Sequence, residues 1–238
     1  QVLHGTPVVE LIREVLRGGY DLLIKVAERP AWLERLLGSD DLQLLRMCPC
    51  PVWLSRPAEP SNYQDILVAV DVDDTYPAAE REARQALNRQ ALEMGISLAL
   101  SDFAALHLVH VWNAVGEGAM RGAILAPPQE QIASYVEQVR RRHAANLDAL
   151  LGEVTDRVGR GALEYLKPRL HLIKGYAREE IPALVKRLKP DLLVMGTVAR
   201  TGVPGLLMGN TAESILNQID CAVLAIKPPG FVTPIASE

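Results

Sequence analysis

The stretch between residues 190 and 228 carries the strongest candidate for binding chemistry. A short apolar run ends at Gly196, further glycines follow at 202, 205 and 209, and a helical pattern begins near Thr211. A glycine-rich loop between a strand and a helix exposes backbone N–H groups where the helix dipole favours anions. The stretch therefore predicts a phosphate site, unless its glycines only satisfy turn geometry. The candidate contacts are Gly196, Ala199, Arg200, Gly209, Asn210 and Thr211.

A carboxylate at the end of another apolar run is the second candidate. Asp71 directly follows the continuous run Ile66–Val70. Ligands of open α/β sheets bind at the carboxyl ends of strands, where a carboxylate accepts hydrogen bonds from ribose hydroxyls. The alternative is that Asp71 only caps the turn that follows the strand, and we interpret Asp73 and Asp74 as turn residues.

The runs GTVARTG, from Gly196, and GNTAE, from Gly209, resemble the tandem, two-domain branch of the universal stress protein family. In nucleotide-binding members, a Gly is followed three residues later by a second Gly and, after nine more, by Gly with Ser or Thr. This chain keeps the spacing but has Ala199 and Asn210 at two of these places. The resemblance implies that ATP or a related nucleotide binds here, with Asp71 near its base and ribose.

Strands and helices alternate through residues 63–229, which predicts a parallel sheet with right-handed crossovers. The fold class is therefore α/β, doubly wound, with helices on both faces. The resemblance implies five strands in the order 3-2-1-4-5, so that Asp71 and Gly196 end adjacent strands. Residues 114–128 hold three glycines and two prolines and predict a mobile loop. The predicted strands are Ile66–Val70, Ala104–Trp112, Leu170–Ile173, Leu192–Met195 and Ala222–Ile226.

The first quarter of the chain repeats the second half of this unit. Asp21 and Asp191 are 170 positions apart, and Cys50 and Cys221 are 171 apart. The repeat predicts two tandem copies of one α/β unit, the first of them partial. The predicted divisions are a partial first domain at 1–57, a linker at 58–62, a complete second domain at 63–229 and a tail at 230–238.

The two copies differ at the glycine loop. Val26 stands where the second copy has Gly196, so we expect no phosphate binding by the first copy. The final strands of the copies, Val52–Leu54 and Val223–Ile226, should each lie at a sheet edge, and a bare edge invites pairing. Family members resemble this chain in joining two domains through such strands. We therefore predict intramolecular pairing of the two last strands.

The cysteine and histidine side chains are weaker candidates, as ligands of a metal ion, than the residues of the phosphate site. Cys48 and Cys50 flank a proline just before a buried strand, where cysteine is commonly a small hydrophobe. A zinc site needs a closed set of ligands. His107 and His110 are three apart on a predicted strand, so their side chains should point to opposite faces. We predict no metal site.

Composition narrows the class of function. The net charge of −4 argues against nucleic-acid binding, and no apolar run reaches membrane-spanning length. Three cysteines make no disulfide framework, so the expected location is cytoplasmic.

Three functions remain open. The first is a regulatory adenine-nucleotide (ATP) binding protein of the stress response. The second is a structural or interaction module of the same fold, which binds no nucleotide and acts through a homodimer or a protein partner. The third is a slow ATPase or phosphotransferase, for which the sequence offers no catalytic residues, metal-bound phosphate cage or positioned base.

Overall fold

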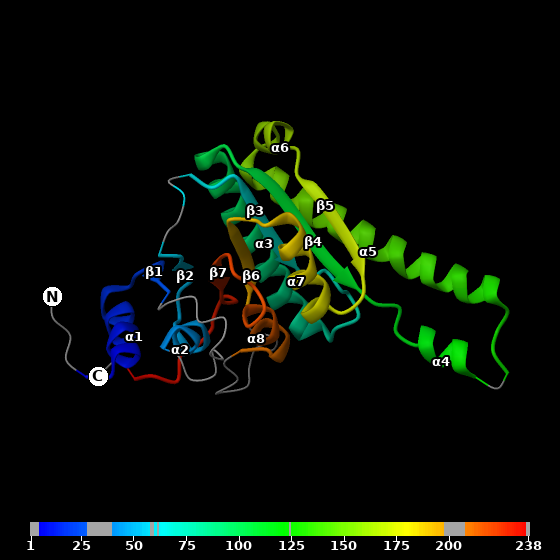
Figure 1. Cartoon of the computed structure of the whole chain (residues 1–238), viewed down its shortest axis with the longest axis horizontal. Helices are drawn as coiled ribbons and strands as arrows, with labels where there is room; N and C mark the ends of the chain where they lie inside the picture. Colours follow the sequence, from blue (N-terminus) through cyan, green and yellow to red (C-terminus); the bar gives the residue numbers. More distant parts are fainter. Residues whose placement is uncertain are drawn as a thin grey trace.

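The structure is a computed structural model that describes residues 5–27, 40–57, 60, 62–123, 125–197 and 208–236. Figure 1 shows the elements in place. The strands are β1 (Leu23–Val26), β2 (Val52–Ser55), β3 (Asp65–Val70), β4 (Ala105–Trp112), β5 (Arg169–Lys174), β6 (Leu192–Gly196) and β7 (Ala222–Ile226). The helices are α1 (Pro7–Gly18), α2 (Asp40–Met47), α3 (Ala78–Asp102), α4 (Glu117–Gly122), α5 (Gln129–Val158), α6 (Arg160–Leu166), α7 (Ala177–Leu188) and α8 (Asn210–Leu216).

The seven strands form one sheet in the order β1-β2-β7-β6-β3-β4-β5. Strands β3 to β7 are mutually parallel where they pair, and β3 lies between β6 and β4. The carboxyl ends of β3 and β6 therefore lie side by side. Among the described residues, no helix is long and apolar enough to cross a membrane.

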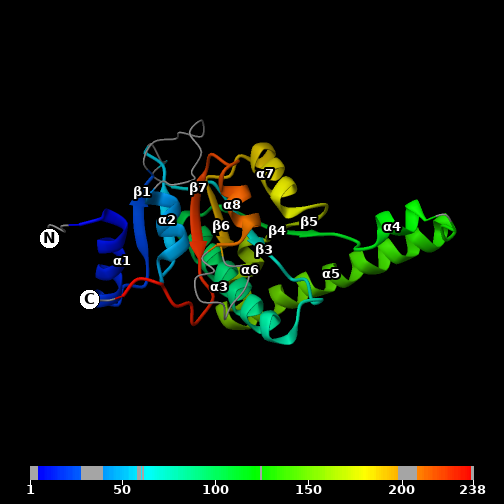
Figure 2. The same cartoon turned by 90° about the horizontal axis from the view of Figure 1, so that it is seen from below.

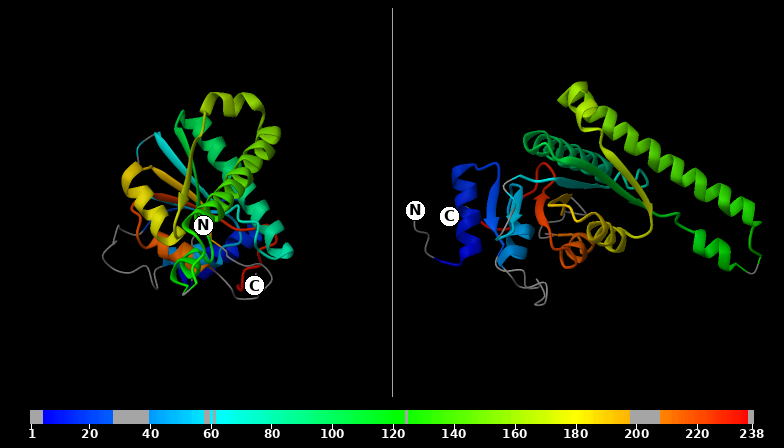
Figure 3. Two further views of the ribbon diagram at one scale, coloured as in Figure 1. Left: turned by 90° about the vertical axis from the view of Figure 1, so that its right-hand side faces the viewer. Right: turned by 45° about the horizontal axis from the view of Figure 1, so that its top comes forward.

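Helices cover both faces of the central strands of the sheet (Figure 3). On β3, Ile66 and Val68 pack into a core with α3 and α5, whereas Leu67 packs into a core with α1, α2, α7 and α8. Successive side chains of a strand point to opposite faces, so a run of consecutive apolar residues is what a strand covered on both faces requires.

The two predicted last strands pair with each other, as expected. Strand β2 runs antiparallel to β7, with Val52 opposite Ala225 and Leu54 opposite Val223. The five strands predicted for residues 63–229 are part of a larger sheet. Because β7 has backbone hydrogen-bonding groups on both sides, its pairing with β2 extends the parallel strands into one mixed sheet of seven.

Side chains also join the first quarter of the chain to its end. Arg46 of α2 forms an ion pair with Glu213 of α8, with a separation of 2.8 Å between Nη2 and Oε2. The tail returns to α1, where Arg13 donates to the carbonyl oxygen of Ala236 at 3.4 Å. Residues of both predicted copies thus contribute to one core beneath α1, α2, α7 and α8.

Helix α5 extends beyond the sheet, and α4 lies beside its far part (Figure 2). The expectation of a loop over residues 114–128 was therefore wrong over α4, which spans Glu117–Gly122. Tyr135 of α5 donates its hydroxyl to the carbonyl oxygen of Val115 at 2.6 Å. This contact ties the start of the α4 segment to α5.

Candidate functional site

A cavity of about 330 Å³ lies at the carboxyl ends of β3, β4, β5 and β6. Its walls are partly apolar, with Leu87 from α3, Ile181 from α7 and Met195 from β6. A small number of polar groups face the same space, which is the usual composition of a small-molecule site. The polar residues around it are Asp71, Asp73, Tyr76, Arg84, Asn88, Asn113, Thr197 and Thr211.

The cavity brings together several of the residues that the sequence singled out. Asp71, Gly196, Gly209 and Thr211 all line it, although Asp71 and Thr211 are 140 positions apart in the chain.

 Asn210 begins α8 with an exposed side chain and is not part of the cavity wall. Ala199 and Arg200 lie outside the described residues, so their predicted contacts stay predictions.

The carboxylate of Asp71 already has partners within the chain. Arg84 of α3 forms an ion pair with it, at 2.8 Å between Nη1 and Oδ2. The hydroxyl of Tyr76 donates to the same oxygen at 3.0 Å. The Asp71 side chain keeps 40% of its surface exposed. Asp71 is therefore a hydrogen-bond acceptor at the cavity edge that already has internal partners.

Asn88, one helical turn beyond Arg84, holds the backbone at the end of β3. Its side-chain oxygen accepts a hydrogen bond from the Asp71 N–H at 3.0 Å, and its Nδ2 donates to the Asp71 carbonyl oxygen at 2.7 Å. Because Arg84 and Asn88 are four apart on α3, they lie on the same side of the helix. One helix face thus holds both the side chain and the backbone of Asp71.

The ionisation of the neighbouring groups follows from their surroundings. Burial raises the pKa of Tyr76 to about 12, and the nearby Asp71 charge acts in the same direction. The guanidinium of Arg84 lies over the Tyr76 ring, 3.7 Å from its centroid. Burial opposes the ionisation of Asp73, but the Thr75 backbone N–H donates to it at 2.9 Å and its pKa is lowered. At neutral pH the edge therefore carries an anionic Asp73 carboxylate and a neutral Tyr76 phenol.

Gly196 has a packing role that the sequence did not reveal. A Cβ atom at this position would lie 2.4 Å from Cδ2 of Leu87 and 2.9 Å from its Cγ. Helix α3 approaches the end of β6 so closely that only glycine fits without movement of Leu87. Packing of Leu87 therefore gives a reason for glycine at position 196 that is independent of a ligand in the cavity.

Thr197 and Gly209, which lie on either side of the glycine-rich loop, are joined by a backbone hydrogen bond. The Gly209 N–H donates to the Thr197 carbonyl oxygen at 2.9 Å, and the Thr197 N–H donates to the Ile226 carbonyl oxygen at 3.2 Å. Gly209 has φ −75°, a value open to any residue. Its amide N–H therefore has a hydrogen-bond acceptor within the chain, and the predicted contact of Gly209 with a phosphate stays a prediction.

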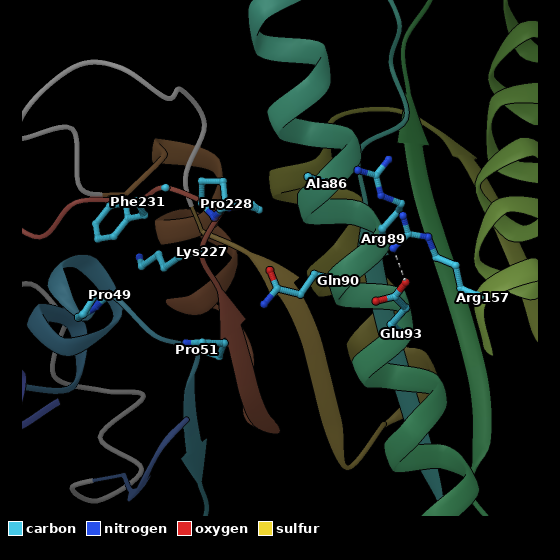
Figure 4. A pocket seen from close by; sticks show the side chains of 12 residues that line it. Pro49, Pro51, Ala86, Arg89, Gln90, Glu93, Arg157, Lys227, Pro228 and Phe231 are labelled. Carbon is cyan, nitrogen blue, oxygen red and sulfur yellow. Dashed lines mark ion pairs between the residues drawn. The ribbon is translucent and has the colours of Figure 1, made fainter. Parts of the chain in front are cut away.

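A buried lysine lies behind the same loop end. The ammonium of Lys227 donates to Thr197 Oγ1 at 2.8 Å and to the carbonyl oxygen of Leu45. Burial penalises its charged form and lowers its pKa to about 7. Lys227 also lines a second cavity of about 460 Å³, together with Pro49, Pro51 and Phe231 (Figure 4).

Two pairs of histidines lie on opposite faces of the sheet, as the spacing of His107 and His110 predicted. His110 Nε2 lies 2.9 Å from His143 Nδ1 of α5, and burial lowers the pKa of both rings. On the other face His107 Nδ1 lies 2.9 Å from His171 Nε2. Within the described part of the chain, no group of three or more His, Cys, Asp or Glu side chains is arranged to hold a metal ion.

Comparison with known proteins places this fold in a family. The family model described as "Universal stress protein family" matches residues 62–227. The chain is 31% identical over 236 residues to universal stress protein E of Escherichia coli strain K12, an alignment that covers 98% of this chain and 69% of that protein. It is 32% identical over 217 residues to the universal stress protein E homolog of Haemophilus influenzae, covering 90% and 64%.

A solved structure has a similar fold. The crystal structure of a functionally unknown protein from Pseudomonas aeruginosa PAO1 superposes with a TM-score of 0.69 at 27% identity, covering 94% of this chain and 69% of that one. The family match spans more than half of the chain, and the similarity to the Escherichia coli protein spans nearly all of it. The chain therefore belongs to the universal stress protein family.

Proposed function

We propose that this chain is a regulatory protein of the stress response that binds an adenine nucleotide, ATP or a relative, in the cavity at the ends of β3 and β6. The observation that carries the proposal is the convergence of Asp71, Gly196, Gly209 and Thr211 on that one cavity. Its volume of about 330 Å³ falls within the range of small-molecule pockets.

The polar groups of the cavity suit a ligand that bears both hydroxyls and a negative charge. The carboxylate of Asp71 can accept hydrogen bonds from ribose hydroxyls, and Arg84 can neutralise an anionic group. These two side chains now pair with each other at 2.8 Å. A nucleotide would replace one internal ion pair by partners for both of its members, so neither charge would be left unpaired.

We also propose that residues 1–57 and 63–229 are two copies of one unit, of which only the second holds nucleotide. The antiparallel pairing of β2 with β7 supports the proposal of two copies, because each of these strands is the last strand of its proposed copy. Val26 at the end of β1, where the second copy has Gly196, supports the second part.

The second candidate function is an interaction module that binds no nucleotide. Two observations favour it: Asp71 has internal partners, and Leu87 alone accounts for glycine at position 196. In this account the residues around the cavity stabilise the junction between α3 and the sheet. The paired domains would then act through protein partners.

A calorimetric titration of ATP into the parent and two variants separates the candidates. Asp71→Ala should weaken binding by about 1–3 kcal/mol, the range for loss of a charged hydrogen-bond partner. The control is Asp74→Ala, because Asp74 lies outside this cavity wall and pairs with Arg142 at 3.3 Å. Equal affinity of Asp71→Ala and parent, or no binding by the parent at millimolar ATP, would reject the nucleotide proposal in favour of the interaction module.

A further inference from the structure

Two of the three cysteines form a close pair at the junction of α2 and β2. The Sγ atoms of Cys48 and Cys50 are 3.5 Å apart, and both side chains are buried. The backbone around them is held on both sides: the Cys48 N–H donates to the Leu44 carbonyl oxygen at 2.9 Å, and the Leu23 N–H donates to the Pro51 carbonyl oxygen at 3.0 Å. The pair is therefore positioned by a helix end and a strand pair.

The two thiols have different surroundings. The hydrogen bond between the Cys48 and Cys50 sulfur atoms lowers the pKa of Cys50, and the Leu23 backbone N–H acts in the same direction. The same hydrogen bond, together with burial, raises the pKa of Cys48. Thiolate, the nucleophilic form of cysteine, is thus favoured at Cys50. Cys221, at the matching place before β7, differs from Cys50, since burial raises its pKa to about 12.

A cavity adjoins this turn. Pro49 and Pro51, the neighbours of Cys50, line the cavity of about 460 Å³ together with Lys227 and Phe231. Figure 4 shows these four side chains around the opening. The two cavities share no lining residue, so this one is separate from the proposed nucleotide site.

We propose that Cys48 and Cys50 are a dithiol–disulfide redox site that exchanges with low-molecular-weight thiols such as glutathione. The proposal rests on the 3.5 Å separation of the sulfur atoms and on the adjoining cavity. A disulfide bond is about 2.05 Å long. The two sulfur atoms must therefore approach by roughly 1.5 Å, and Pro49 between them restricts the backbone through its fixed φ.

The exchange balances with a small disulfide as the oxidant. The Cys50 thiolate attacks one sulfur of oxidised glutathione, forms a mixed disulfide and releases one glutathione thiolate. The Cys48 thiol then loses its proton and attacks the Cys50 sulfur, which releases the second glutathione thiolate. Both released thiolates take up the protons that the two cysteines lost. In sum, the protein dithiol is oxidised by two electrons and one glutathione disulfide is reduced to two thiols.

To test the proposal, the folded protein is incubated with glutathione mixtures of increasing oxidised fraction and then quenched with acid. The remaining thiols are alkylated with N-ethylmaleimide in denaturant and counted by intact-mass measurement. The parent should change from three alkylated thiols to one, with no increase in chain association. Cys221→Ser, the matched control, should change from two to none. Cys48→Ser should accumulate a glutathione adduct at Cys50, because the second thiol is missing.

The outcome on the parent alone decides the proposal, so it does not depend on the folding of the serine variants. Three alkylated thiols at the most oxidising mixture would overturn it. So would a disulfide that involves Cys221 or links two chains. Peptide mapping of the oxidised parent distinguishes these results, because the predicted linkage lies between Cys48 and Cys50 within one peptide.

Discussion

Replacing Gly196 by Ala tests whether the end of β6 is shaped by helix packing. The added Cβ would lie 2.4 Å from Cδ2 of Leu87, a separation that forces one of the two groups to move. Overpacking of this kind typically costs about 1–3 kcal/mol. We expect the free energy of unfolding, measured by urea denaturation, to fall by about that amount.

The double variant Gly196→Ala/Leu87→Ala identifies the obstacle. Leu87→Ala alone should cost about 2–5 kcal/mol, because Leu87 is buried. In the double variant the new methyl group has room, so the combined loss should be smaller than the sum by about 1 kcal/mol or more. The control is Gly152→Ala, on the exposed side of α5 with no atom within 4 Å of the new Cβ, which should gain up to about 1 kcal/mol of helix stability.

Strict additivity of the two substitutions would refute this reasoning, because it would mean that Leu87 does not limit the space at position 196. A parent-like stability of Gly196→Ala would do the same. In either case the glycine would have to be explained by the cavity, as the sequence first indicated.

Three further changes probe the charges. Arg84→Met should lower the free energy of unfolding by about 1 kcal/mol, because the carboxylate partner of Arg84 is partly exposed. The loss caused by this substitution should be smaller in 1 M salt, which screens the ion pair. Equal losses at low and high salt would contradict an ion-pair role. Between about pH 7 and 10.5 the unfolded chain binds more protons at Lys227 than the folded one, so stability should rise with pH there. Melting curves of Lys227→Met should lose that rise, and an unchanged pH slope would be the contrary result. The lowered pKa values of His110 and His143 mean that the unfolded chain binds more protons below about pH 6.5, so stability should fall as pH drops through that range. His110→Gln should flatten this decline in acid melting curves, and an equally steep decline would count against the histidine pair.

Much of the architecture could be predicted because it follows from periodicity and repetition. Apolar runs such as Ile66–Val70 fit strands buried on both faces, and β3 covers this run. The internal repeat identified β2 and β7 as equivalent last strands, and edge-strand physics then predicted their pairing. What periodicity could not predict was that this pairing joins all strands into a single mixed sheet.

The site was predictable in part. Asp71, Gly196, Gly209 and Thr211 could be expected at one sheet edge, because each stands at the end of a strand or the start of a helix. The partners of Asp71 were missed. Arg84 and Asn88 are polar residues on a helix rich in alanine, and their four-residue spacing is equally typical of a solvated face.

The role of glycine at position 196 was also hidden, for a related reason. A glycine before a loop has the same appearance in sequence whether a ligand or a side chain needs the space. The structure shows that the Leu87 side chain of α3 lies close to Gly196, and this long-range contact is not visible in the sequence. Long-range packing therefore decided what local spacing left open.

The most direct test of the central proposal is a crystal structure of the protein grown with millimolar ATP. The account predicts one nucleotide per chain in the cavity at the ends of β3 and β6, with its sugar or base in hydrogen-bond contact with Asp71. An empty cavity would contradict the account, as would a nucleotide bound only in the cavity beside Lys227.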